Sequence, residues 1–139
     1  MIEDTIDDLN KLLEFEIGAR DTYAQNMGST VEQSFSKVLE DNRKSHSERV
    51  SSLQDAIKKL EGKAVATAKL WGVFGKAIGG ATAAMGDQAT IDILAKGEAS
   101  LLEVYKSMID KRGNSAILSK LMEKQEESKR RITELKKSA

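Results

Sequence analysis

Two glutamates occupy equivalent places in the two halves of the sequence. When the sequence is laid on itself with an offset of 82 residues, Glu16 matches Glu98, and a tyrosine follows each glutamate seven residues later, at Tyr23 and Tyr105. Each glutamate lies on an otherwise apolar helical stripe, where burying a carboxylate without a partner is costly. The repeat therefore predicts one shared polar cluster, flanked by two core tyrosines with tethered hydroxyl groups.

The same offset aligns polar residues downstream of each glutamate. Arg43 matches Gln125, and His46 matches Ser128. The chain has one histidine and no cysteine, so any ligand or catalytic group must be an oxygen or an imidazole nitrogen. No serine or acidic residue has a local spacing to His46 that is typical of an activated nucleophile, so we predict no catalytic residue and no enzymatic activity.

An ionised glutamate inside an apolar core needs a partner of opposite charge. We expect Arg43, assisted by Arg20, to form forked hydrogen bonds to Glu16 and Glu98 in a structural salt-bridge cluster.

Helical periodicity surrounds all of these residues and predicts an all-α fold. Apolar residues recur at alternating spacings of four and three, which indicates one helical hairpin over residues 4–61 and a second over residues 87–137. Gly28 is expected to end the first helix, and Ser29 with Glu32 forms a capping-box pattern for the second. Gly62 is expected to end the second helix, and Asp87 to cap the third.

A long connection, residues 62–86, links the predicted hairpins. It is rich in alanine and glycine and long enough to run the full length of a bundle. Leu70, Trp71, Phe74 and Ile78 predict a short extra helix lying across the outside of the bundle. The alternative is peripheral membrane attachment, with Trp71 and Phe74 inserted into a bilayer interface. We expect packing against the bundle.

This arrangement of glutamates and helices resembles the ferritin-like superfamily, and within it the small bacterial stand-alone bundles classed as domains of unknown function. The resemblance covers nearly the whole chain and implies a four-helix bundle with a long crossover. In metal-binding members, single glutamates come from helices 1 and 3 and a Glu-x-x-His pair comes from each of helices 2 and 4. The resemblance places Glu16, Glu98 and His46 at three of these six positions, whereas Arg43, Gln125 and Ser128 replace the others. It therefore implies a degenerate di-iron site.

The resemblance also leaves an alternative, in which Glu16, His46 and Glu98 still bind iron or another divalent metal. Because the guanidinium charge of Arg43 is permanent and disfavours a nearby metal cation, we expect the salt-bridge cluster, with no metal and no cofactor.

Composition bounds the remaining expectations. The chain has 139 residues, 40% apolar and 32% charged, with no proline, which fits a single domain over residues 1–139. We expect a cytoplasmic protein because its first residues lack the pattern of a secretory signal. Its net charge is zero, and a basic tail that includes Lys129 and Arg130 is expected to complement a helix dipole, so no nucleic-acid partner is predicted. The predicted role is structural or stress-associated, in a homodimer or higher homo-oligomer.

Overall fold

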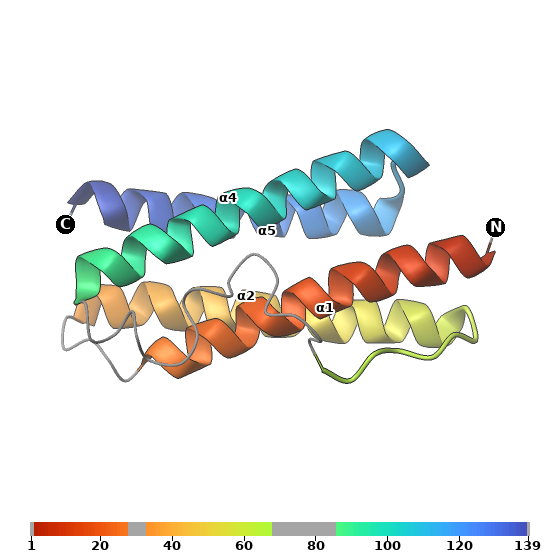
Figure 1. Cartoon of the computed structure of the whole chain (residues 1–139), viewed down its shortest axis with the longest axis horizontal. Coiled ribbons are helices and arrows are strands. Elements are labelled where there is room, and N and C mark those ends of the chain that lie inside the picture. The colour runs from red at the N-terminus through yellow and green to blue at the C-terminus, as the bar shows by residue number, and fades with distance from the viewer. Residues whose placement is uncertain (1, 28–32, 68–85, 139) are drawn as a thin grey trace.

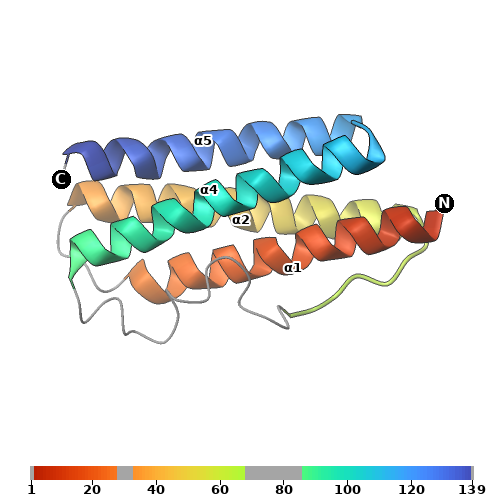
Figure 2. The same cartoon turned by 45° about the horizontal axis from the view of Figure 1, so that its top comes forward.

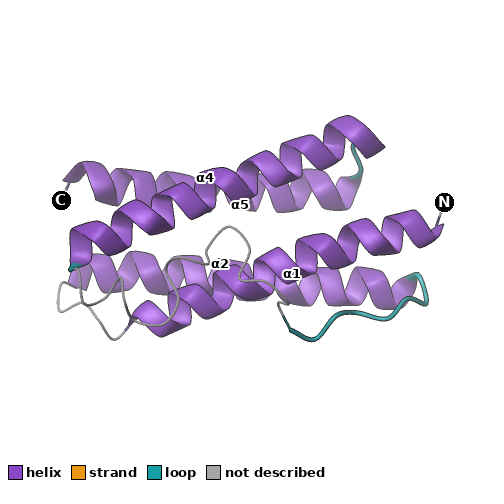
Figure 3. Ribbon diagram, in the orientation of Figure 1, coloured by secondary structure: helices purple, strands orange, loops and turns teal. Residues whose placement is uncertain are grey.

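The protein is described by a computed structural model over residues 2–27, 33–67 and 86–138. These residues contain four helices and no strand, so the chain is an all-α bundle as predicted (Figure 3). Helix α1 spans Ile2–Asn26 and α2 spans Gln33–Lys59. Helix α4 spans Asp87–Arg112 and α5 spans Ala116–Ser138. The helix bounds lie within a few residues of those that the periodicity predicts.

The helices form two antiparallel hairpins, α1 with α2 and α4 with α5, that pack side by side (Figure 1). Across the hairpins, α1 packs on α4 and α2 packs on α5, and both of these pairs are also antiparallel (Figure 2). Helix α2 ends at the end of the bundle where α1 begins, whereas α4 begins at the opposite end. The connection between the hairpins must therefore cover the length of the bundle.

Glycines lie at the end of α2 and at the start of α4. Glu61 has a φ of 60°, and the amide of Gly62 donates to the carbonyl of Ile57 (2.9 Å), which closes the last turn of α2. A Cβ on Gly62 would lie 2.8 Å from the side chain of Ile6, so the chain passes α1 closely there. The prediction for α4 was wrong in one respect: the N-cap residue is Gly86, and Asp87 is the first helical residue. At that position the negative charge of Asp87 interacts favourably with the helix dipole.

Side chains from all four helices fill the core. Helix α1 has more buried residues than any other described helix, and its fully buried Leu12 and Leu13 lie next to the polar residue Glu16. Leu53 and Ile57 of α2, and Leu94 and Leu101 of α4, are also fully buried. The other core residues are of the same apolar type and include Leu9, Ile17, Leu39, Val50, Ile91, Leu118, Leu121, Ile132 and Leu135. Apolar layers therefore lie along the bundle on both sides of the buried polar residues.

Several predictions concern residues outside the described ranges. These are the end of the first helix at Gly28, the capping box of Ser29 and Glu32, and the short helix or membrane anchor at Trp71 and Phe74. Within the described residues, the crossover begins at the outer side of α1, where Asn10 donates to the carbonyl of Lys63 and accepts from the amide of Val65, both at 2.9 Å. None of the described helices combines the length and the apolarity needed to cross a bilayer.

Candidate functional site

Nine polar side chains meet in the middle of the bundle and have no exposed surface. All four helices contribute to this central cluster, which places carboxylates, an imidazole, a guanidinium, two phenols and amides in one apolar surrounding. Such groups are stable inside a protein only when each has hydrogen-bond partners. The members of the central cluster are Glu16 and Tyr23 from α1, Asn42, His46 and Arg49 from α2, Glu98 and Tyr105 from α4, and Gln125 and Ser128 from α5.

His46 bridges the two glutamates. Its Nδ1 lies 2.5 Å from Glu16 Oε1, and its Nε2 lies 3.0 and 3.1 Å from the two oxygens of Glu98. A neutral imidazole carries one proton, so one of its nitrogens would direct a lone pair at a carboxylate. Both contacts become charge-assisted hydrogen bonds when the ring is protonated. The geometry therefore favours a protonated His46, whose two ring nitrogens donate to the carboxylates of Glu16 and Glu98.

Arg49 supplies the second positive charge. One of its terminal nitrogens donates to Glu16 (3.1 Å) and to the side-chain oxygen of Gln125, and the other donates to the hydroxyl of Ser128 (2.8 Å). That second nitrogen also lies 3.3 Å from the hydroxyl of Ser45, which is one turn earlier on α2. The fork geometry of arginine lets a single side chain satisfy acceptors on three helices.

The two tyrosines contact the glutamates reciprocally across the hairpins. Tyr23 follows Glu16 on α1 but donates to Glu98 (2.9 Å), and Tyr105 follows Glu98 on α4 but donates to Glu16 (2.5 Å). The ring of Tyr23 also stacks on His46, with centroids 5.6 Å apart and an angle of 22° between the planes. The repeat found in the sequence is thus expressed as an exchange of hydrogen bonds between α1 and α4.

Two amides complete the hydrogen bonding. The Gln125 amide nitrogen donates to the backbone carbonyl and to Oε1 of Glu98, at 2.8 and 3.0 Å. The Asn42 amide nitrogen lies 3.0 Å from the Tyr23 hydroxyl, 3.2 Å from Glu98 and 3.0 Å from the Ser128 carbonyl. The oxygen of Asn42 accepts from Arg131 (2.9 Å), whose side chain reaches the surface of α5. Both amides have fixed orientations because their donor and acceptor ends face different partners.

The charges of the central cluster balance. Burial acts to raise the pKa of Glu16, but Arg49 and His46 outweigh it and hold this pKa below its usual value. Burial is likewise outweighed at Glu98, whose pKa is lowered by His46 and Arg49. Burial and Arg49 act to lower the pKa of His46, yet Glu98 and Glu16 raise it above its usual value. When His46 is protonated, two carboxylates face an imidazolium and a guanidinium, and the charges of the central cluster balance.

The tyrosines take no charge in this arrangement. Burial raises the pKa of Tyr23 well above its usual value, and the neighbouring charge of Glu98 raises it further. Burial and the neighbouring Glu16 have the same effect on the pKa of Tyr105. Both phenols remain protonated near neutral pH and act as hydrogen-bond donors to the carboxylates.

Seven of the nine residues that the sequence singles out lie in the central cluster, and two arginines do not. Arg43 points outward and pairs with Glu40 one turn before it on α2, at 2.6 and 2.8 Å, with 32% of its side chain exposed. Arg20 pairs with the adjacent Asp21 at the edge of α1. The predicted contacts of these arginines with Glu16 and Glu98 are therefore not formed.

Sequence reasoning missed Arg49 and Asn42. The buried stripe of α2 is wide enough to include two neighbouring helical rows, and the prediction followed the row containing Arg43. A row through Asn42, His46, Arg49 and Leu53 has the same alternation of four and three. Its three polar residues give this row no apolar signal, so only pairing with polar residues on other helices reveals that it is buried.

The residues of the central cluster do not fit a di-metal centre. Among the described residues, no group of three or more histidine, aspartate or glutamate side chains is arranged to hold a metal ion. Both nitrogens of His46 are directed at carboxylates, and the guanidinium of Arg49 lies between Glu16 and the neutral side chains of Gln125 and Ser128. A cation placed there would meet a fixed positive charge.

The comparisons with known proteins identify a family without an assigned role. No curated protein and no solved structure matches the chain. A family model described as a domain of unknown function, DUF2383, matches residues 4–111. The matched range includes both glutamates, both tyrosines, His46 and Arg49, and it ends before α5. Since the match covers more than half of the sequence, the chain belongs to the DUF2383 family of domains of unknown function.

Proposed function

We propose that this chain is a non-enzymatic, ferritin-like structural or interaction module in which two side-chain cations take the place of a di-metal centre. The observation that carries the proposal is the position of Arg49. Its guanidinium contacts Glu16, Gln125 and Ser128, three residues that stand at metal-ligand positions in the ferritin-like pattern. Together with a protonated His46, it supplies two positive charges against two carboxylates.

Burial supports a structural role for these groups. Each acid, base and phenol in the central cluster is fully buried and hydrogen-bonded to a neighbour, so a substrate would have to displace existing partners to reach it. Several contacts also cross from one hairpin to the other, including His46 with Glu98 and Tyr105 with Glu16. Sliding one hairpin along the other would leave a buried charge unpaired, so the central cluster favours a single register.

The test is metal binding with and without Arg49. Protein purified without chelator and then incubated anaerobically with Fe²⁺ is assayed by elemental analysis after desalting. We expect no stoichiometric metal in the natural sequence. A triple variant, Arg49→Ala with Gln125→Glu and Ser128→His, removes the guanidinium and restores a carboxylate and an imidazole, and it is expected to retain iron.

The matched control is Arg43→Ala, which removes an arginine from the same helix outside the central cluster and should leave metal content unchanged. Stoichiometric metal in the natural protein that disappears in a His46→Ala variant would contradict the proposal. That result would instead favour a metal-binding bundle that uses Glu16, His46 and Glu98. The predicted self-association remains a separate proposal, which light scattering coupled to size-exclusion chromatography tests.

A further inference from the structure

A cavity of about 390 Å³ lies at the end of the bundle where α1 begins and α4 ends. Its floor is apolar and is formed by Leu9, Leu60, Met108, Ile117 and Leu118 from all four helices or the turns between them. This volume and apolar lining are typical of small-molecule sites. The same end of the bundle also carries Ile2, the most exposed large apolar residue described, with 61% of its surface in solvent.

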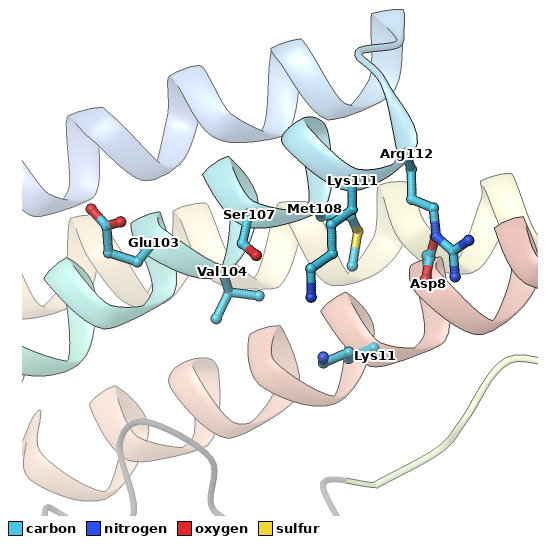
Figure 4. Close-up of a pocket in the computed structure, with 8 residues that line it drawn as sticks. All are labelled: Asp8, Lys11, Glu103, Val104, Ser107, Met108, Lys111 and Arg112. Atoms are coloured by element: carbon cyan, nitrogen blue, oxygen red, sulfur yellow. The ribbon is translucent and has the colours of Figure 1, made fainter.

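A second space of about 330 Å³ adjoins this cavity between α1 and α4. The linings of the two spaces share Asp8, Met108 and Arg112, so the spaces are adjacent, one at the bundle end and one on its flank; we call them together the groove. Figure 4 shows the residues that line the flank. The flank is polar: Lys11 of α1 and Lys111 of α4 lie on the two helices that form it. The groove therefore has an apolar end and a cationic end.

The two lysines are the uncompensated charges of the flank. Arg112 pairs with Asp8 (2.9 Å), and Glu103 lies 3.8 Å from Lys106. Within the part of the chain that the structure describes, Lys11 and Lys111 form no ion pair. An anionic group at the flank would complement them, and a hydrocarbon chain attached to it would reach the apolar floor.

We propose that this groove binds a single-chain amphiphile with a carboxylate head, of the fatty-acid class. The head lies near Lys11 and Lys111, and the chain lies over Met108 between Leu9 and Leu118. The lining side chains that are described include no aromatic ring on which a nucleobase would stack, and the apolar end is of the size of one chain. None of the residues that line the groove belongs to the central cluster.

Isothermal titration calorimetry of the full chain with dodecanoate, below its micelle concentration, tests the proposal. Dodecyltrimethylammonium is the matched probe, because it has the same chain and the opposite head charge. We expect saturable binding of one dodecanoate per chain, with an affinity about tenfold higher than that for dodecyltrimethylammonium. Lys11→Glu combined with Lys111→Glu should reverse this preference, whereas Lys137→Glu, at the far end of α5, should leave it unchanged. Far-UV circular dichroism verifies that each variant is folded.

A bulky residue at the rim tests the apolar end separately. Thr5 is exposed and lines the cavity, so Thr5→Trp should preserve the fold and weaken both amphiphiles by about tenfold or more. Non-saturable binding, or equal affinity for the two head groups, would overturn the proposal. So would self-association of the free protein that Thr5→Trp abolishes, because a second copy of the chain would then occupy the groove.

Discussion

At the residue scale, the central cluster depends on an arginine whose position could not be told from charge alone. Arg43 and Arg49 lie on the same helix, six residues apart, yet only Arg49 is buried. Arg43 pairs with Glu40 at the surface, where an ion pair contributes little to stability. Arg49 neutralises a fully buried carboxylate, and its loss would leave an uncompensated charge in the core.

The same substitution is therefore expected to have a large effect on stability at Arg49 and a small effect at Arg43. Arg49→Met should lower the free energy of unfolding by about 3 kcal/mol, because Glu16 loses its guanidinium partner and Gln125 and Ser128 lose a donor. Arg43→Met should change it by no more than about 0.5 kcal/mol. Guanidinium chloride denaturation followed by far-UV circular dichroism measures both. Equal losses in the two variants would show that the buried ion pair of Arg49 contributes no more to the free energy of unfolding than the surface pair of Arg43.

At the element scale, the crossover begins with a specific contact and not with a free end. Helix α2 closes with Glu61 in the left-handed region, which turns the chain back toward α1. Asn10 of α1 then holds the next residues through the carbonyl of Lys63 and the amide of Val65. One side chain thus satisfies two backbone groups that no helix or strand would otherwise use.

Asn10→Ala should therefore release the start of the crossover. We expect a loss of about 1 kcal/mol in the free energy of unfolding, the usual magnitude for such hydrogen bonds. The exchange rate of the Val65 amide hydrogen, followed by NMR, should rise about tenfold or more, while amides in the middle of α1 keep their protection. The neighbouring exposed substitution Lys11→Ala serves as the control. Unchanged protection at Val65 would show that Asn10 does not hold this segment.

At the scale of the whole molecule, the central cluster joins the two hairpins by charge. Hairpin α1–α2 carries Glu16, His46 and Arg49, so its share of the central cluster is positive by one charge when His46 is protonated. Hairpin α4–α5 carries Glu98, so its share is negative by one. Only the assembled bundle is neutral. The protonation state of these few groups must therefore affect the stability of the entire fold.

The direction of this pH dependence follows from the pKa shifts. The pKa of His46 is raised in the folded protein above 6.5, so its contribution is complete below pH 6.5 and is lost as the pH rises through the folded value. The pKa values of Glu16 and Glu98 are lowered below 4.5, so their contribution is complete above pH 4.5 and is lost as the pH falls through the folded values. The contribution of the central cluster should be greatest between pH 4.5 and 6.5.

Urea denaturation at a series of pH values measures this profile. His46 is the only histidine, so a His46→Gln variant should lose most of the decline in stability above pH 6.5 while keeping the acid limb. The variant is also expected to be less stable than the natural protein between pH 4.5 and 6.5, because the neutral amide of glutamine cannot balance the charge of a glutamate. An unchanged alkaline limb in His46→Gln would show that the imidazole is not charged in the folded protein.

The sequence by itself determined the four helices and most of the central cluster. The alternation of apolar residues is a local property of each helix, and it predicted α1, α2, α4 and α5 within a few residues. The offset of 82 residues related Glu16 to Glu98 and Tyr23 to Tyr105, because equivalent positions in two similar hairpins face the same interior. Gln125, Ser128 and His46 were found for the same reason.

Only the tertiary structure decided which positive charge serves the glutamates. Arg43 and Arg49 have the same chemistry and lie on neighbouring rows of one helix, so periodicity cannot separate them. Which of the two is buried depends on how α2 is rotated about its axis against α1, α4 and α5. The packing of the whole core sets that rotation. The reciprocal bonds of Tyr23 and Tyr105, and the groove between α1 and α4, likewise arise from distances between helices that no single helix encodes.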